Sequence, residues 1–345
     1  MQFTPLVGLA GGAVLGLAAF GKYVINGRVL GISGGIKGWL TGDWRSWRVA
    51  FNGGLLAAAM VAGFITPAAF DTLPASYTVE RAALGGLLVG LGASVGNGCT
   101  SGHGICGNAR LSARSFAYTL TFMAAGVAAA TLSGTAQALG ILAQTAPLVW
   151  WPSDVVINQG AMLVAAAILG VAGCGALAKG IEAGSRKAVS LLTELVAGGL
   201  FAFGLTYTGM VRPTKVAAFL SPLYPAWDPT LMCVMGGALL VALPGFQWVK
   251  RARSAPPKPL AGDAYLEPAA KAIDARLLLG GLLFGAGWGL SGMCPGPALV
   301  ALVATGVPPP QVAAYCGAMV AGMALDCASQ GTLALVPPSK KAKPA

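Results

Sequence analysis

Residues 81–107 read RAALGGLLVGLGASVGNGCTSGHGICG, an apolar, glycine-rich run that ends in two cysteines and the single histidine of the chain. Its first part is apolar enough to enter a membrane, where about 20 apolar residues span the hydrocarbon core. Its second part is rich in glycine, which weakens helices, and irregular backbone at membrane depth is tolerated only inside protein. The stretch therefore predicts a helix that breaks in a protein-lined cavity, with Cys99, His103 and Cys106 at the break.

The same pattern returns in the second part of the chain. Residues 276–294 read RLLLGGLLFGAGWGLSGMC and align without a gap with residues 81–99. The two runs share an initial arginine, a Gly-Gly-Leu-Leu stretch, two further glycines and the final cysteine, which is Cys99 in one and Cys294 in the other. The apolar runs that follow them match as well, and the first runs of each half match more weakly. We infer two copies of one structural unit.

The composition is that of a membrane protein. Of the 345 residues 56% are hydrophobic and 10% are charged, whereas soluble domains carry about 25% charged residues. The 51 glycines are small enough to let transmembrane helices approach closely. We predict an all-α integral membrane protein of about nine transmembrane helices, with short re-entrant or broken helices that meet near the midplane. The expected spans are residues 4–21, 50–67, 82–98, 113–134, 155–178, 188–210, 229–249, 277–293 and 310–336.

This pattern divides the chain into four parts. Residues 1–135 form the first membrane repeat and residues 188–336 the second. Residues 136–187 connect them and include a central transmembrane helix. Within the second repeat, residues 250–276 are rich in proline, alanine and charge, which predicts a flexible cytoplasmic linker. Residues 337–345 are expected to be a disordered cytoplasmic tail.

The positive charges predict how the chain lies in the membrane. Of the 22 lysines and arginines, 19 fall in alternate gaps between spans or in the tail, and 3 fall in the remaining gaps. Cytoplasmic loops carry the excess of lysine and arginine, so the N-terminus is expected outside and the C-terminus in the cytoplasm of a plasma (inner) membrane. The net charge of +11 thus indicates membrane orientation, and we expect no nucleic-acid partner. Nine crossings would also invert the second repeat relative to the first, as in many secondary transporters.

The two cysteine loops are the candidate substrate path. Helix N-termini and glycine-rich turns attract anions, and a thiol is a polarisable partner for a sulfur atom. We therefore predict a transporter for a small sulfur-containing anion that passes between two intramembrane cysteines. The predicted path residues are Cys99, Thr100, Ser101, Gly102, His103, Cys294, Pro295 and Gly296.

Other interpretations of these residues stay open at this point. A cysteine in a transmembrane helix is often a small packing residue, and Cys106 fits that role. Cys99, His103 and Cys106 have the spacing C-x3-H-x2-C, which supplies three soft metal ligands but matches no strong zinc pattern. Cys99 and Cys294 would instead form a redox or sulfurtransferase pair if their Cα atoms lay within about 7 Å. We expect no metal, no cofactor and no enzymatic activity.

Four further charged residues are weaker candidates. Arg212 and Lys215 lie in a gap that the charge distribution places outside, so they are candidates for attracting an anion to the path. Glu194 and Asp326 lie inside apolar runs, where a carboxylate is functional by default unless a nearby cation pairs with it. Proton coupling and structural ion pairing are both open for these two.

The motifs resemble those of the YeeE/YedE family of sulfur transport membrane proteins. The resemblance rests on GNGCTSGHGICG at residues 96–107 and SGMCPGPAL at residues 291–299, and on TGMVRPTKVAAFL followed by WDPTLMCVMGGAL in the second half. It implies an hourglass-shaped helical bundle with the two halves fused, and uptake of thiosulfate or a related compound relayed between Cys99 and Cys294. It also suggests a small cytoplasmic sulfur-carrier protein as a partner.

The charge distribution makes a prediction about the two thiols. It places the loop after residues 277–293 outside and the loop after residues 82–98 on the cytoplasmic side. An impermeant thiol reagent added from outside should therefore modify Cys294 before Cys99. Mass spectrometry of the two cysteine peptides over time tests this order, and faster modification of Cys99 would contradict it.

Overall fold

The computed structural model describes residues 1–180, 182, 185–252, 258–268 and 270–334, and these residues form helices without a β-strand. Nine helices are long: α1 (Pro5–Asn26), α3 (Ser46–Ile65), α4 (Val79–Val95), α5 (Ala113–Leu132), α7 (Asp154–Gly180), α8 (Arg186–Tyr207), α10 (Thr230–Arg251), α11 (Ala275–Ser291) and α13 (Pro310–Ser329). Six are short: α2 (Ile32–Leu40), η1 (Pro67–Ala69), η2 (Thr100–Gly107), α6 (Thr135–Ala138), α9 (Pro213–Leu220) and α12 (Pro295–Ala304).

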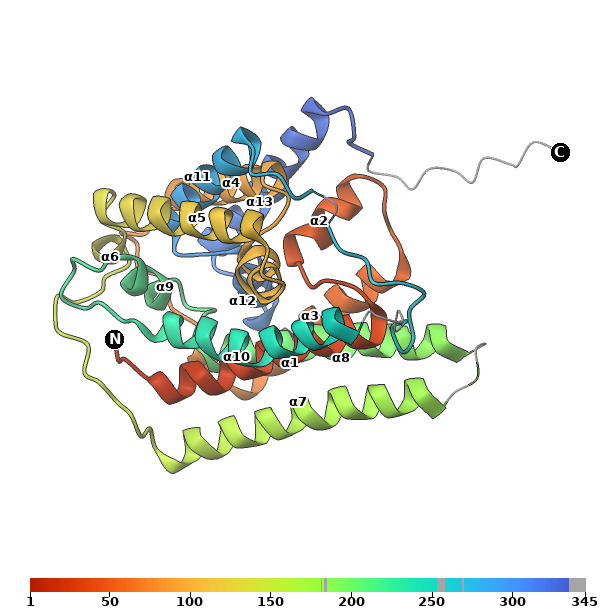
Figure 1. Ribbon diagram of the computed structural model, residues 1–345. Helices are drawn as coiled ribbons and strands as arrows, with labels where there is room; N and C mark the ends of the chain where they lie inside the picture. Colours follow the sequence, from red (N-terminus) through yellow and green to blue (C-terminus); the bar gives the residue numbers. More distant parts are fainter. Residues whose placement is uncertain (181, 183–184, 253–257, 269, 335–345) are drawn as a thin grey trace.

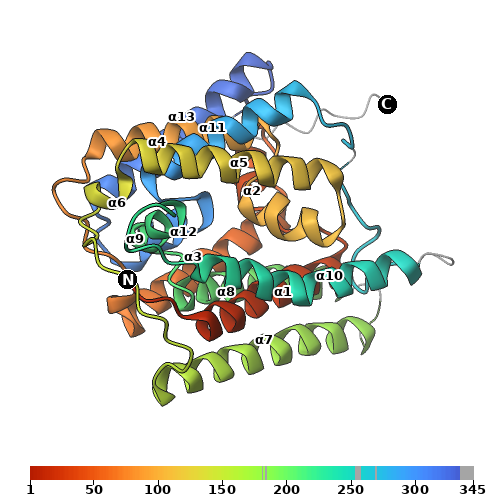
Figure 2. The same ribbon diagram turned by 60° about the vertical axis from the view of Figure 1, so that its left-hand side comes forward.

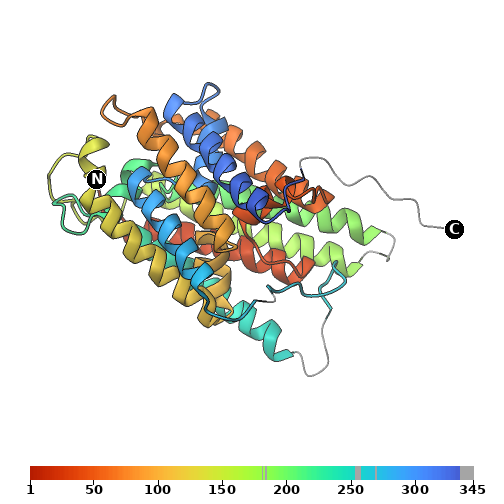
Figure 3. The same cartoon turned by 90° about the horizontal axis from the view of Figure 1, so that it is seen from above.

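The long helices confirm the predicted membrane bundle. Among the residues that the structure describes, eight helices are long and apolar enough to cross a membrane. A ninth crossing results if α4 and η2, which meet at an angle of 47°, are taken as one broken span. Seen from above in Figure 3, the long helices lie side by side along one general direction, as helices that share a bilayer do.

The long helices form two layers with short helices between them (Figures 1 and 2). One layer contains α1, α3, α8 and α10, and the other contains α4, α5, α11 and α13. The short helices α2, η2, α9 and α12 contact both layers and occupy the middle of the bundle. The long connector helix α7 lies along the outside and packs on α1 and α8. The polar ends of the short helices are therefore placed at the centre of the molecule.

Corresponding helices of the two halves make corresponding contacts. Helix α4 packs on α13 while α11 packs on α5, and α1 packs on α10 while α8 packs on α3. At the crossing of α4 and α11, Gly85 lies against Gly287 and Gly92 lies against Gly280. The residue numbers rise along one helix as they fall along the other, so α4 and α11 run antiparallel. A two-fold axis in the membrane plane would generate these pairs, and the inverted repeat stays a prediction that they support.

Some boundaries differ from the sequence-based expectation. Residues 32–40 were expected to be part of a loop but form α2, because their apolar residues pack between the layers instead of spanning them. Helix α13 ends at Ser329, seven residues earlier than expected. In the linker expected at residues 250–276, the helix α10 continues to Arg251, and residues 260–266 form hydrogen bonds to the backbone at the end of α1. The expected tail, residues 337–345, lies outside the described residues.

The glycine crossing yields a stability prediction. A Cβ atom at Gly92 would overlap the backbone of Phe284, so Gly92→Ala should force α4 and α11 apart and lower the free energy of unfolding by about 1–3 kcal/mol. Gly317→Ala on α13, where a Cβ would meet no atom within 4 Å, is the matched control. The thermal unfolding midpoints of the purified variants in detergent test this, and equal midpoints would contradict close packing at the crossing.

Candidate functional site

Each of the two cysteines stands at the N-terminus of a short central helix. Cys99 precedes η2 and Cys294 precedes α12, and both have extended backbones, with φ, ψ of −137°, −169° and −126°, 166°. Both side chains are buried, at 2% exposure. The first N–H groups of a helix have no helical acceptor and carry a partial positive charge. The fold therefore places both thiols beside groups that stabilise an anion.

Two tyrosines fix the backbone immediately before the cysteines. The Tyr118 hydroxyl on α5 is shared between the Gly98 and Gly92 carbonyls, each 3.2 Å away, and the Tyr315 hydroxyl on α13 donates to the Met293 carbonyl at 2.8 Å. Both tyrosines are fully buried and belong to the last helix of their half. The sequence analysis did not identify them. They could have been found in the sequence as tyrosines inside apolar spans, because a buried hydroxyl needs a hydrogen-bond partner.

The two cysteine loops meet through hydroxyl groups. The first loop comprises residues 96–107, which include η2, and the second loop comprises residues 291–299. The Thr100 hydroxyl donates to Cys294 Sγ at 3.8 Å, so a residue of the first loop touches the thiol of the second. Cys99 Sγ and Ser101 Oγ are 3.3 Å apart. Ser101 Oγ in turn accepts from the backbone N–H of Ile32, which joins the first loop to α2. The line from Cys294 to Cys99 therefore consists of two polar contacts, Thr100 with Cys294 and Ser101 with Cys99, which the backbone between Thr100 and Ser101 connects.

A small cavity surrounds this line of contacts, and we call it the central cavity. Its volume is about 20 Å³, which is room for about one water molecule. Two methionines that the sequence analysis missed, Met210 and Met235, line it together with the two cysteines. The cavity is thus walled by four sulfur-bearing side chains and by apolar groups. Its lining comprises Leu15, Ile32, Cys99, Thr100, Ser101, Ile105, Phe201, Leu205, Met210, Val234, Met235, Cys294, Gly296 and Pro297.

A much larger pocket of about 500 Å³ lies on the other side of the first loop, and we call it the vestibule. Gly98, Gly102 and His103 line it, whereas Cys99, Thr100 and Ser101 line the central cavity. The first loop is therefore the wall between the two spaces. The vestibule is also lined by six cations, all from gaps that the charge distribution assigns to the cytoplasm: Lys22, Arg48, Arg110, Arg114, Lys250 and Lys271.

His103 holds the first loop in place. Its Nε2 lies 3.3 Å from the Gly96 carbonyl, which can only accept, so Nε2 carries the proton. Its Nδ1 then accepts from the Ser115 hydroxyl at 2.9 Å, and the ring packs on Tyr118 at 4.3 Å. Both ring nitrogens are therefore occupied, which leaves His103 with a positioning role. Cys106 is fully buried, and no group of three metal-ligating side chains is found within the described part of the chain.

Of the remaining predicted path residues, Pro295 and Gly296 lie at the start of α12, and Gly102 lines the vestibule. Pro295 is the first residue of α12, where its missing N–H costs nothing, and Gly296 follows it in the central cavity. Gly102 faces the vestibule, and a Cβ there would meet no atom within 4 Å. The structure thus places the predicted residues on the two sides of the first loop and at the start of α12.

Both intramembrane carboxylates have cationic partners. Glu194 is fully buried, lies 2.7 Å from Lys22 and 3.2 Å from Arg28, and accepts from Asn26. This group joins α8 to the end of α1. Its position favours the structural interpretation of Glu194 over proton coupling.

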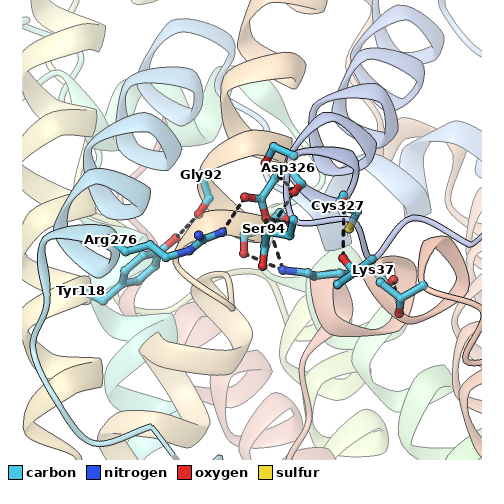
Figure 4. Close-up of polar contacts among 11 residues, drawn as sticks. Lys37, Gly92, Ser94, Tyr118, Arg276, Asp326 and Cys327 are labelled. Carbon is cyan, nitrogen blue, oxygen red and sulfur yellow. Dashed lines mark hydrogen bonds and ion pairs between the residues drawn. The ribbon is translucent and has the colours of Figure 1, made fainter.

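Asp326 forms a second such group (Figure 4). Its carboxylate lies 2.6 Å from Arg276 and 3.4 Å from Lys37, and it accepts from the Ser94 hydroxyl at 2.5 Å. Helix α13 is thereby joined to α11, α2 and α4, close to the place where α4 breaks. Asp326 thus holds α4 in place just before the first loop begins.

The two outer cations also have partners. Lys215 forms a 2.8 Å ion pair with Asp228, and Arg212 lies 3.9 Å from Asp71 and donates to the Ala69 carbonyl at 3.0 Å. Neither lines the central cavity. Arg212 is 41% exposed and Lys215 is 13% exposed, so Arg212 is the more accessible. Their role in attracting an anion stays a prediction.

Comparisons with known proteins point to one class of membrane protein. The sequence model of a family described as sulphur transport matches residues 3–129, and that of a family of unknown function (DUF6691) matches residues 189–331. A probable transporter of Xylella fastidiosa (strain 9a5c) is 43% identical over 129 residues, which are 37% of this chain and 84% of the relative. Another, from strain Temecula1, is 39% identical over 132 residues, which are 37% of this chain and 95% of the relative. Each relative is therefore less than half as long as this chain.

The tyrosine anchors yield a prediction for each loop. Tyr118→Phe leaves the Gly98 carbonyl without this buried partner, which costs about 1–3 kcal/mol locally and should raise the labelling rate of Cys99 about tenfold. Tyr315→Phe should do the same for Cys294 only. Labelling with a small thiol reagent and mass spectrometry of each peptide measures both rates.

Tyr207→Phe is the control, because its hydroxyl donates to the Val156 carbonyl, away from both loops. Unchanged rates in the first two variants, or equal acceleration in all three, would show that the tyrosines do not anchor the loops.

Proposed function

Because this chain belongs to the sulphur transport family of membrane proteins, with two halves fused in one chain, we propose that it imports a small sulfur-containing anion, thiosulfate in the first instance. The observation that carries the proposal is that the first loop contacts both thiols, Cys294 through Thr100 and Cys99 through Ser101, in a cavity lined by four sulfur-bearing side chains. The proposal extends to the plasma membrane as location and to the cytoplasm as destination.

The electrostatics of the site suit a small anion. The two short helices η2 and α12 both begin at a cysteine of the central cavity, so their positive ends face the same space. A buried anion is costly unless it is hydrogen-bonded, and the first N–H groups of η2 and the Thr100 and Ser101 hydroxyls are donors of the required kind, whereas α12 begins Pro-Gly-Pro and offers only the Gly296 N–H. The apolar remainder of the lining excludes water and strengthens each of these interactions.

The thiols give the site its preference for sulfur. A thiol is a weak donor, and sulfur is large and polarisable, so an anion with a terminal sulfur atom makes favourable contacts with both cysteines and both methionines. In the proposed relay the anion passes from Cys294 to Cys99 by exchanging one S–H···S contact for the next. No covalent bond forms or breaks, and the hydroxyl of Thr100, the residue after Cys99, donates to Cys294.

The cavity must widen for an anion to pass, because about 20 Å³ holds about one water molecule. Two features of the lining support such widening. Methionine side chains are flexible, and Met235 lies over Gly104 of the first loop. The loop itself is a π-helix, a rare conformation that is frequent at functional sites. If the halves are inverted repeats, their relative movement would open the cavity to one side at a time.

The first test is uptake of labelled thiosulfate by cells that lack their own importers. Removal of a hydrogen bond to a charged group costs about 1.5–3 kcal/mol, so Cys99→Ala and Cys294→Ala should each reduce uptake at least about tenfold at matched expression. Cys174→Ala is the control, since Cys174 is a buried cysteine of α7 far along the outside of the bundle.

Each alternative result has a defined meaning. Uptake that survives both substitutions would show that the cysteines are packing residues. Absence of wild-type uptake by protein that is inserted in the membrane would overturn thiosulfate as the substrate. Cys99→Ser and Cys294→Ser separate the contribution of sulfur from that of a hydrogen-bond donor, and we expect both to be impaired.

A further inference from the structure

The start of helix α2 adjoins both the central cavity and the vestibule. Ile32 lines the central cavity and donates its N–H to Ser101, whereas Ser33, Gly34 and Gly35 line the vestibule. A substrate that passes Cys99 into the vestibule therefore meets this helix end. The path described above does not use it.

Two polar side-chain atoms near this helix end lack hydrogen-bond partners among the described residues. They are Ser33 Oγ and Asn52 Oδ1, and both residues line the vestibule. Ser33 is 3% exposed and Asn52 is 2% exposed. Buried polar atoms are nearly always hydrogen-bonded, so two unpartnered atoms in one wall indicate a missing ligand.

The backbone adds two further donors. Ile32 uses its N–H for Ser101 and Gly35 uses its N–H for the Gly31 carbonyl, but the N–H groups of Ser33 and Gly34 find no backbone acceptor in the described part of the chain. They lie at the positive end of a helix of nine residues. Ser33 thus offers two donors, its N–H and its hydroxyl, beside the Gly34 N–H.

The surroundings are positively charged. Six cations line the vestibule, and the lining carboxylate is Glu267. Three of these cations pair with carboxylates beyond the lining: Lys22 with Glu194, Arg48 with Asp43 and Arg114 with Asp274. The six lining cations are thus matched by four carboxylates, which are Glu267 and the three pairing partners. Such an excess in a concave site concentrates anions.

The site also has room and a fixed frame. A Cβ at Gly34 would meet no atom within 4 Å, so the space before this residue is open. Gly35 is closely backed by Asn52, and Arg48 donates to the Gly34 carbonyl. The far end of α2 is held by the ion pair of Lys37 with Asp326, which Figure 4 shows. The donors are therefore held in place before any ligand arrives.

We propose that Ser33 and Gly34 form a second anion site at the start of α2, which takes a small sulfur oxyanion as it leaves Cys99 for the cytoplasm. This step rests on the proposed transport function. The oxygens of the anion accept from the Ser33 hydroxyl and the two free N–H groups, while Asn52 Oδ1 accepts from water bound with it. The central cavity recognises sulfur, and this second site recognises oxygen.

Equilibrium binding of labelled thiosulfate to the purified full-length protein tests the site. The protein carries Cys99→Ala and Cys294→Ala, so that the signal reports the vestibule alone. Ser33→Ala removes one charge-assisted hydrogen bond and should raise Kd at least about tenfold. Gly34→Val places a side chain in the open space and should abolish binding. Gly53→Val is the matched control, because a Cβ at Gly53 on α3 also meets no atom within 4 Å and lies on the exposed surface.

The outcomes separate this proposal from the transport proposal. Binding that is unchanged by Ser33→Ala and Gly34→Val would overturn the site even if wild-type protein imports thiosulfate. Binding that these variants weaken would support the site even if uptake fails. Inorganic phosphate is the competitor: weaker displacement by phosphate than by unlabelled thiosulfate supports a station on the sulfur path, and equal displacement overturns it.

Discussion

The structure depends on one constraint, which is that a helix broken inside a membrane must satisfy its backbone within the protein. Tyr118 and Tyr315 meet that constraint at equivalent places, since each donates its hydroxyl to the carbonyl before a cysteine. With those carbonyls satisfied, the first N–H groups of η2 point to the centre of the bundle, and at the start of α12 two prolines leave only the Gly296 N–H. The same break that would destabilise a simple span thus creates a place for negative charge.

The two faces of the first loop separate two kinds of chemistry by only a few residues. Cys99, Thr100 and Ser101 face a narrow space walled by sulfur and hydrocarbon, whereas Gly98, Gly102 and His103 face a wide, cationic one. His103 and the Asp326 group hold this thin wall from two sides. In the proposed path, selection by sulfur contacts and collection by charge would therefore take place at different points of the molecule.

Much of this arrangement could be predicted from the sequence. The spans follow from the length of apolar runs, and the pairing of Cys99 with Cys294 follows from a repeat that keeps its register over a whole helix. The helix α2 could not be found in this way, because its nine residues are stabilised by the layers around it and not by a span-length pattern. Met210 and Met235 join the site only through tertiary packing. Arg212, Lys215, Glu194 and Asp326 stood out as single charges, and only the fold shows that each has a partner of opposite charge.

Helix α7 contributes little to the interior, since it packs on α1 and α8 from outside and only 17% of its apolar window is buried. Its importance lies in the number of membrane crossings between the two halves, which must be odd. Helices α4 and α11 cross antiparallel through their glycines, and a single polypeptide can bring two like segments together in that way only if an odd number of crossings separates the copies. In the predicted topology α7 is that crossing, and by joining the two halves in one chain it fixes their ratio at one to one.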